Sequence, residues 1–172
     1  MYHERVHKAN RPGSPRGDGR RKAGQALRHP PRRREDRAGV IQGGVPPRGV
    51  FLVFLENNPD TFLVAEYNGK IVGYVMAYLR PDLEGHIMSI AVDPSYRGNG
   101  IGSALLTEAI ERLIGKGARY IGLEVRVSNE KAIRLYERFG FRKIKRIIGY
   151  YADGEDAYYM LMPAEDWGGG RN

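Results

Sequence analysis

The sequence has no cysteine and no apolar run long enough to cross a membrane. Without cysteine the chain has no disulfide framework and no metal site built on thiolates. A membrane-spanning helix needs about 18 or more consecutive apolar residues, so no span is predicted. The N-terminus also lacks the apolar segment of a secretory signal. We therefore expect a cytoplasmic protein that contacts no membrane.

Acidic residues are scarce in residues 1–49, which carry the whole positive charge. This segment has 13 Lys/Arg and 4 Asp/Glu, whereas residues 50–172 have 15 and 16. The segment also contains 8 Gly and 6 Pro, and its few apolar residues follow no helix or strand period. Such a composition does not bury enough surface to offset its ordering entropy. We predict a disordered or misannotated segment; the functional alternative is an arm that binds nucleic acid through phosphate contacts.

From Val50 onward the hydrophobic pattern predicts one domain over residues 50–163, followed by a short tail over 164–172. The Asn68-Gly69 pair is a strong hairpin signal, because both turn positions need positive φ. Helices are predicted from apolar residues at helical spacing and strands from β-branched and apolar runs. The expected helices are 50–56, 100–114 and 129–139, and the expected strands are 61–67, 70–79, 86–92, 120–127, 141–150 and 157–162. This order indicates a mixed α/β sheet.

Three glycines alternate at positions 98, 100 and 102, between a predicted strand and a predicted helix. Glycine lets the backbone approach a ligand closely and adopt positive φ. The first N–H groups of the helix lack intrahelical partners and, with the helix dipole, form an anion site suited to a pyrophosphate. Arg97 adds positive charge at the rim. A plain flexible turn remains the alternative, because this glycine pattern alone is weakly specific.

The segment Arg97-Gly98-Asn99-Gly100-Ile101-Gly102 resembles the Arg/Gln-x-x-Gly-x-Gly/Ala motif of GCN5-related N-acetyltransferases (GNAT). A second block over residues 123–141 resembles the branch that acetylates protein N-termini, which includes ribosomal-protein alanine acetyltransferases and archaeal Ard1-like enzymes. The resemblance spans about residues 51–163. It implies the GNAT fold, a mixed and mostly antiparallel sheet with flanking helices. Residues 1–49 show neither the first strand nor the first helix of that fold, so the N-terminal elements are expected to be incomplete or divergent.

The resemblance also implies acetyl-CoA as co-substrate and no metal. The glycine loop then binds the CoA pyrophosphate, and the strand before it pairs with the pantetheine arm. The residues that this resemblance places at acetyl-CoA are Ile90, Ala91, Val92, Arg97, Gly98, Asn99, Gly100, Ile101, Gly102, Ser103, Asn129 and Tyr136.

Acetyl transfer to an amine requires a neutral amine, a stabilised thioester oxygen and a proton for the departing thiolate. The resemblance makes Glu124 the general base, with His86 as its partner in holding a water. It makes Tyr136 the general acid and the Val92 N–H the candidate oxyanion donor. The alternatives are an ordinary strand carboxylate for Glu124, an edge histidine for His86 and a core residue for Tyr136.

The resemblance implies that Tyr150 and Tyr151 line the peptide-entry groove; the alternative is a pair of turn-flanking β-formers. The favoured substrates are protein N-termini, such as those of ribosomal proteins or nascent chains. An α-amine has a pKa of about 7.7–8.0 against about 10.4 for lysine, so it needs less help from a base. Lysine or small-amine acetylation is the alternative. Two others are a CoA-binding module with a basic nucleic-acid arm and a subunit that needs a partner.

Overall fold

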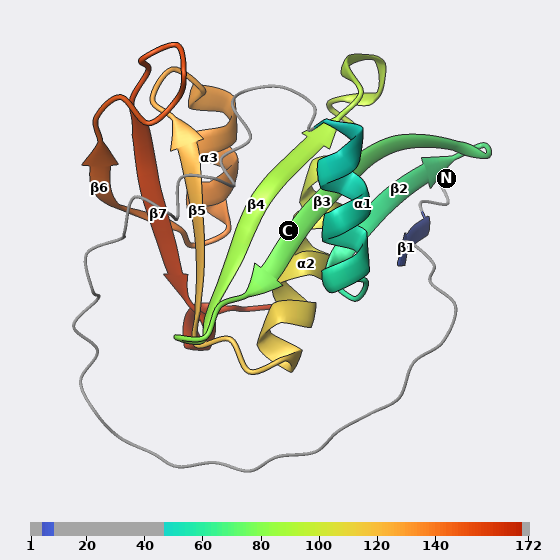
Figure 1. Ribbon diagram of the computed structural model, residues 1–172, viewed down its shortest axis with the longest axis horizontal. Coiled ribbons are helices and arrows are strands. Elements are labelled where there is room, and N and C mark those ends of the chain that lie inside the picture. The colour runs from blue at the N-terminus through green and yellow to red at the C-terminus, as the bar shows by residue number, and fades with distance from the viewer. Residues whose placement is uncertain (1–4, 9–46, 170–172) are drawn as a thin grey trace.

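The computed structural model describes residues 5–8 and 47–169. Seven strands form one sheet in the order β1-β2-β3-β4-β5-β7-β6 (Figure 1). All neighbouring strands are antiparallel except β4 and β5, which are parallel. The elements are β1 (Arg5–Lys8), α1 (Arg48–Asn57), β2 (Phe62–Tyr67), β3 (Lys70–Leu79), β4 (Glu84–Val92), η2 (Pro94–Tyr96), α2 (Ile101–Gly115), β5 (Tyr120–Arg126), α3 (Glu130–Arg138), β6 (Arg142–Ile147), β7 (Ala157–Pro163) and η3 (Ala164–Asp166).

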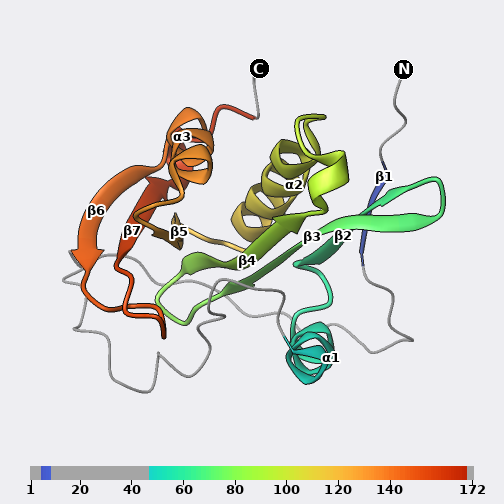
Figure 2. The same cartoon turned by 90° about the horizontal axis from the view of Figure 1, so that it is seen from above.

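The helices cover the two faces of the sheet unequally. Figure 2 shows α2 and α3 on one face and α1 on the other. The α2 side holds the larger core, to which the helix contributes Ile101, Leu105, Leu106, Ala109, Ile110 and Leu113. Full burial of a side chain such as leucine contributes about 1.5–3 kcal/mol, so this face anchors the fold. The α1 side has a smaller aromatic cluster built on Phe54, Phe62 and Met76.

Local signals in the sequence place several of these elements. Asn68 and Gly69 take φ values of 49° and 76°, which confirms the predicted hairpin between β2 and β3. Asn129 caps α3, since its side chain accepts a hydrogen bond from the Ala132 N–H. Gly140, with φ of 89°, follows the end of that helix. The predicted mixed sheet with flanking helices is confirmed.

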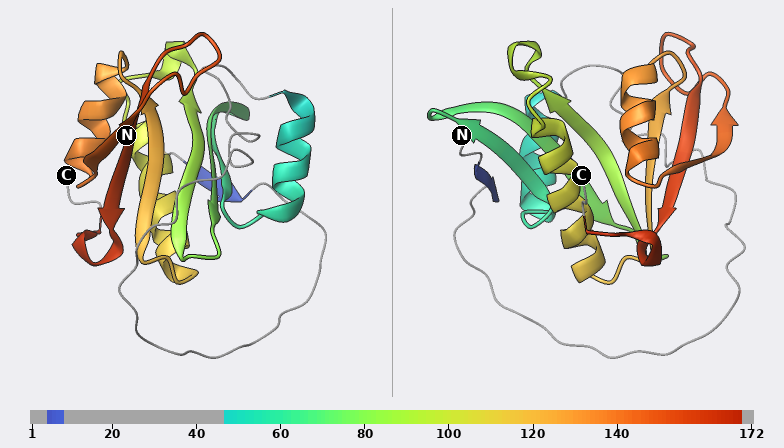
Figure 3. Two further views of the ribbon diagram at one scale, coloured as in Figure 1. Left: turned by 60° about the vertical axis from the view of Figure 1, so that its left-hand side comes forward. Right: turned by 180° about the vertical axis from the view of Figure 1, so that it is seen from behind.

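The parallel pair of strands separates part of the way along its length. The ladder joins Glu84–Ile87 of β4 to Tyr120–Leu123 of β5. Beyond it the two strands diverge, as Figures 1 and 3 show. Met88 is a bulge residue at this point, because Met76 pairs with Ser89 while the next residue of β3 pairs with Ile87. The open stretch of β4, residues 88–92, leads directly to the glycine loop.

Three details differ from the sequence-based expectation. We expected no strand in residues 1–49, but β1 pairs with β2 at the edge of the sheet, so that expectation is wrong for residues 5–8. The strand predicted from residue 86 begins at Glu84. The strand predicted to run to residue 150 ends at Ile147, because Gly149 turns the chain with φ of 58°. The predicted disorder of residues 9–46 lies outside the described residues, as does most of the suggested nucleic-acid arm.

Candidate active site

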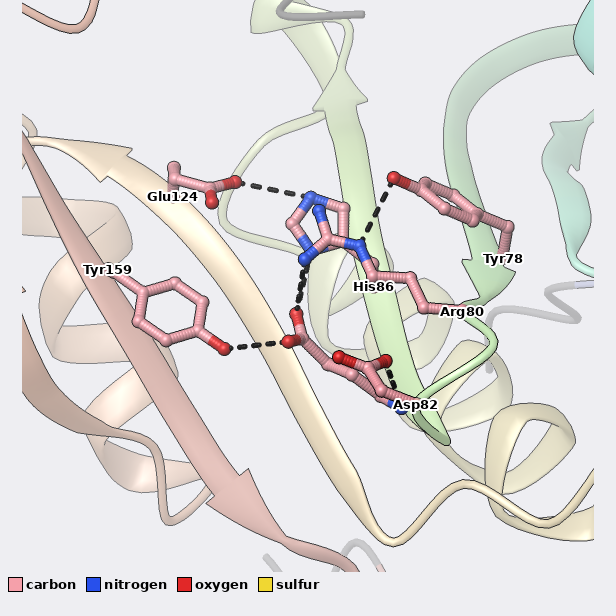
Figure 4. Close-up of polar contacts among 7 residues, drawn as sticks. Tyr78, Arg80, Asp82, His86, Glu124 and Tyr159 are labelled. Carbon is pink, nitrogen blue, oxygen red and sulfur yellow. Dashed lines mark hydrogen bonds and ion pairs between the residues drawn. The ribbon is translucent and has the colours of Figure 1, made fainter. Parts of the chain in front are cut away.

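The α1-facing side of the sheet carries a buried polar cluster centred on His86, where β4 and β5 begin to separate. The Nε2 atom of His86 lies 3.2 Å from Oε2 of Glu124, and its Nδ1 atom lies 3.1 Å from Oε1 of Glu84. The side chains of His86 and Glu124 are each 6% exposed. Figure 4 shows the imidazole with Glu124 on one side, Tyr159 below it and Tyr78 and Arg80 opposite. The structure therefore brings together the two residues expected to form the base.

Glu84 contacts three other side chains of the cluster. Its Oε1 atom lies 3.1 Å from Nδ1 of His86 and accepts from NH1 of Arg80 at 3.0 Å, and its Oε2 atom accepts from the Tyr159 hydroxyl at 2.9 Å. Burial opposes the charged form of Glu84. The hydrogen bond from His86, the charge of Arg80 and the Tyr159 hydroxyl outweigh that effect, so the pKa of Glu84 lies below its usual range. Glu84 is therefore a buried carboxylate that stays ionised.

The turn between β3 and β4 explains why Arg80 meets Glu84. The Arg80 N–H donates to the Glu84 carbonyl at 2.8 Å, and the Leu83 N–H donates to the Arg80 carbonyl at 3.0 Å. Leu83 adopts φ of 64°, a left-handed conformation that costs leucine about 1–2 kcal/mol. Asp82 accepts a hydrogen bond from the Glu84 N–H at 3.2 Å and supports the same turn.

A glycine on β5 makes room for this carboxylate. Gly122 pairs with His86 in the parallel ladder, so Glu84 crosses over it to reach Tyr159. A Cβ atom at position 122 would lie 3.0 Å from Cδ of Glu84 and 3.0 Å from the Tyr159 hydroxyl. Tyr159 pairs with Glu124 across β5 and β7, which places both side chains on this face.

The glycine loop has the conformation expected of an anion site. Gly98 and Gly100 both take φ of 83°, and Gly100 is the N-cap of α2. The Ala104 N–H donates to the Gly100 carbonyl, so the preceding N–H groups of the first helical turn are directed toward the loop. Arg97 ties the loop to β4, because its Nε donates to the Val92 carbonyl at 3.0 Å. This geometry fits a pyrophosphate.

Some of the other residues of the glycine loop contribute a side chain, and others contribute only their backbone. Asn99 donates its side-chain amide to the Tyr96 carbonyl at 3.1 Å, which stabilises the turn. Ile101 is buried in the α2 core, so only its backbone faces the loop. Gly102 and Ser103 belong to the first turn of α2.

The open edge of β4 fits an extended ligand. The Asp93 N–H donates to the Val72 carbonyl on β3 at 2.8 Å. Successive N–H groups of a strand point in opposite directions, so the Val92 N–H points away from β3, toward the side from which β5 has diverged. Ile90 and Ala91 lie on the same open stretch. Its backbone is therefore available for strand-like pairing with an elongated arm.

Tyr136 lies on α3 and is 7% exposed. Its ring packs against Phe141 with centroids 5.9 Å apart. Burial raises the pKa of Tyr136, and the nearby Tyr151 adds to the effect, so the phenol keeps its proton at neutral pH. Asn129 caps the same helix.

The Tyr150-Tyr151 pair lies in the turn region after β6. Tyr151 is buried, and the Arg126 guanidinium covers its ring 3.9 Å from the centroid. Burial raises the pKa of Tyr151 to about 12. Tyr150 packs edge-on against it and is partly exposed. The expected groove position of these two residues stays a prediction.

Three acidic residues in the turn between β6 and β7 form ion pairs with arginines. Arg126 pairs with Asp153 at 2.8 Å and with Glu155 at 2.6 Å, and Arg146 pairs with Asp156 at 2.7 Å. The two pairs of Arg126 hold the β6–β7 connection onto β5, and the Arg146–Asp156 pair joins the end of that connection to β6.

Comparison with known proteins places the chain in a family. The sequence model of the Acetyltransferase (GNAT) family matches residues 30–141. The chain belongs to this family. It is also 42% identical over 129 residues to the N-alpha-acetyltransferase of Sulfurisphaera tokodaii, covering 68% of this chain and 77% of that protein.

Solved structures of GNAT proteins have the same fold as this one. The crystal structure of Ard1 from Thermoplasma volcanium has a TM-score of 0.67 and 29% identity, covering 70% of this chain and 82% of that one. The NatC complex bound to Gag peptide and CoA contains a chain with a TM-score of 0.65 and 28% identity, covering 76% of this chain and 92% of that one. The predicted GNAT fold and the resemblance to N-terminal acetyltransferases are thereby confirmed.

Within this GNAT domain the sequence analysis missed Arg80, Glu84, Gly122 and Tyr159. Two signals pointed to them. Glu84 and His86 are two residues apart and so share one face of a strand. A glycine inside a strand, such as Gly122, often marks a close approach of another group. Among the described residues no helix is long and apolar enough to cross a membrane.

Proposed function

We propose that this chain transfers the acetyl group of acetyl-CoA to the free α-amine of protein N-termini. The observation that carries this proposal is the buried His86–Glu124 pair at the point where β4 and β5 separate, on the strand that leads to the glycine loop. The named relatives support the substrate class, since the Sulfurisphaera protein is an N-alpha-acetyltransferase. The CoA and peptide bound in the NatC complex support the two substrates.

The loop and β4 hold acetyl-CoA in this proposal. The N–H groups at the start of α2 bind the pyrophosphate, and Arg97 contributes positive charge. The open edge of β4 over residues 88–92 pairs with the pantetheine arm. Acetyl-CoA supplies the activated acetyl group, and the Val92 N–H stabilises the negative charge that develops on its thioester oxygen.

Glu124 and His86 prepare the amine. An α-ammonium has a pKa of about 7.7–8.0, so at neutral pH it must lose one proton before it attacks. Glu124 takes this proton, directly or through a water that it shares with His86. The neutral amine then forms the N–C bond to the acetyl group, and its second proton is released to solvent as the amide forms. Tyr136, which burial keeps protonated, donates a proton toward the sulfur when the thioester C–S bond breaks.

The proposal is tested with peptides that offer one amine each. One set carries a free N-terminus beginning with Ser, Ala or Met-Leu and has no lysine. The other has a blocked N-terminus and one lysine. We expect transfer to the free α-amines, with kcat lowered about 10²-fold or more by Glu124→Gln, since general-base catalysis contributes about 10²–10⁴-fold. The matched control is Glu108→Gln, which changes a partly exposed carboxylate on α2 that pairs with Arg112.

Transfer only to lysine would replace this proposal with lysine acetylation. An unchanged rate in Glu124→Gln would contradict the assignment of the base. If CoA binds but neither peptide set is acetylated, the chain is a CoA-binding module or a subunit that needs a partner.

A further inference from the structure

His86 has a carboxylate at each ring nitrogen, and this arrangement restricts where its protons lie. A neutral imidazole has one N–H donor and one acceptor nitrogen. An ionised carboxylate only accepts hydrogen bonds. Glu84 at 3.1 Å and Glu124 at 3.2 Å therefore cannot both be ionised and both be bonded to a neutral His86. Each contact needs a proton of its own.

In the contact between His86 and Glu84, the position of the proton is fixed. Arg80 and the Tyr159 hydroxyl both donate to Glu84, at 3.0 and 2.9 Å, and stabilise its charged form. An ionised carboxylate can only accept a hydrogen bond, so the donor in the 3.1 Å contact between Glu84 and Nδ1 has to be His86. The proton on Nδ1 therefore stays with His86.

In the contact between His86 and Glu124, the position of the proton is not fixed. With Nδ1 protonated, Nε2 of a neutral ring is an acceptor that faces a carboxylate 3.2 Å away. These two atoms stay in contact only when one proton lies between them, on Nε2 or on Glu124. When that proton leaves, the contact becomes repulsive and opens toward a water or an amine. Nε2 and Glu124 thus form a proton-accepting pair.

We propose that Glu84 is a positioning residue that holds His86 with its proton on Nδ1, so that Nε2 is the nitrogen that shares and exchanges a proton with Glu124. This inference rests on the proposed function, because the exchanged proton comes from the substrate α-ammonium. In each turnover one N–H bond of that ammonium breaks, the proton passes to the Nε2–Glu124 pair, and the pair releases it to solvent. The proton on Nδ1 does not move.

The surroundings of Glu84 support a positioning role over a purely structural one. Glu84 is 3% exposed, and the absence of a side chain at Gly122 leaves room for its carboxylate beside Tyr159. Tyr78 packs edge-on against the imidazole, with centroids 5.4 Å apart, and restricts its rotation. The cluster holds both the orientation of the ring and the position of one proton.

The test reads the histidine tautomer directly by ¹⁵N NMR of protein labelled at histidine. The chain has four histidines, and the His86 signals are assigned by their loss in His86→Gln. At a pH at which the spectrum shows His86 to be neutral, we expect Nδ1 to carry the proton and Nε2 to have the shift of an unprotonated nitrogen. A wild-type spectrum with the proton on Nε2 alone overturns the proposal, whether or not the Glu84 variants fold.

Two variants of Glu84 distinguish the role of its oxygen as a hydrogen-bond acceptor from the role of its negative charge. Glu84→Met removes the acceptor while retaining an unbranched apolar side chain in a buried site. We expect the His86 proton to move to Nε2 and kcat to fall by roughly 10²-fold or more, as in other enzymes with a displaced histidine tautomer. KM for both substrates should stay within about twofold, because neither contacts Glu84. Glu84→Gln keeps an oxygen that accepts a hydrogen bond from Nδ1. It should therefore retain the wild-type tautomer and most of the kcat that Glu84→Met loses.

Glu108→Met is the matched control, since it makes the same change at a surface carboxylate of α2, and it should alter neither kcat nor the His86 spectrum. A fall in kcat for Glu84→Met without a change of tautomer would mean a structural role and overturn the proposal. An inactive wild-type protein that shows the expected tautomer would contradict the proposed function and leave the Glu84–His86 assignment standing.

Discussion

Gly122 on β5 lies directly beneath the Glu84 side chain of β4, and the absence of a Cβ at this position lets the carboxylate reach Tyr159. A Cβ there would stand 3.0 Å from Cδ of Glu84 and from the Tyr159 hydroxyl. A side-chain contact across β5 thus joins β4 and β7, which are not neighbours in the sheet. The first prediction follows from this close approach.

Gly122→Ala should displace Glu84 and destabilise the protein by about 1–3 kcal/mol, the usual range for overpacking a filled core. It should also lower kcat, because His86 loses its partner. Urea denaturation and steady-state kinetics measure the two effects. Gly115→Ala is the control, since a Cβ at that position meets nothing within 4 Å. Equal stability of the two variants would contradict the packing seen here.

Tyr136→Phe should lower kcat about 10²-fold or more if the phenol donates the proton to the leaving sulfur. Burial raises the pKa of Tyr136 above its usual value near 10, so its proton remains in place up to that pH. We therefore expect no loss of kcat from Tyr136 ionisation between pH 8 and pH 10. A decline in this range that disappears in Tyr136→Phe would show that the phenol is more acidic than its burial implies.

Gly100→Ala should weaken acetyl-CoA binding. Gly100 is the N-cap of α2 with φ of 83°, a conformation that costs other residues about 1–2 kcal/mol. The alanine variant shifts the loop and its N–H groups, so we expect the Kd of CoA to rise about tenfold, which corresponds to about 1.4 kcal/mol. Calorimetric titration with CoA measures this change. The KM of the peptide should be unaffected, and Gly115→Ala should bind CoA normally.

Lowering the pH should weaken the attachment of the β6–β7 connection, because Glu155 becomes protonated. The hydrogen bonds from Ser128 and Arg126 lower the pKa of Glu155 from 4.5 to about 2. Because the folded pKa lies below the unfolded value, the stabilisation is complete above pH 4.5 and is lost as the pH falls toward 2. Glu155→Gln should therefore be less stable than the wild type at pH 7, and the difference should shrink below pH 4.5. Urea midpoints at several pH values test this, and a constant difference would contradict it.

The sequence predicts the fold well where hydrophobic spacing and turn chemistry agree. The apolar face of α2, the Asn68-Gly69 hairpin and the Asn129 cap are all local features. β1 was missed because four residues in a basic segment have too short a pattern to indicate a strand. The pairing with β2 that defines it is a long-range contact.

The site was predictable only in part for a similar reason. His86, Glu124 and the glycine loop lie in motifs that resemble a known family. Arg80, Glu84 and Tyr159 come from three segments, and their contact depends on the register of β3, β4, β5 and β7. The sequence-based strand began at residue 86 and so left Glu84 in a loop. The roles of the site residues remain predictions.

The four-residue ladder between β4 and β5 has a mechanical consequence. His86 belongs to the half of the sheet that carries α1 and α2, whereas Glu124 belongs to the half that carries α3. Their separation is therefore governed by the joint between the two halves, just below the point of divergence. Ile87 and Leu123 are core residues at this joint. Their packing therefore helps to set the distance between His86 and Glu124, although neither residue takes part in the reaction. Small changes in their volume should tune the rate before they affect the fold.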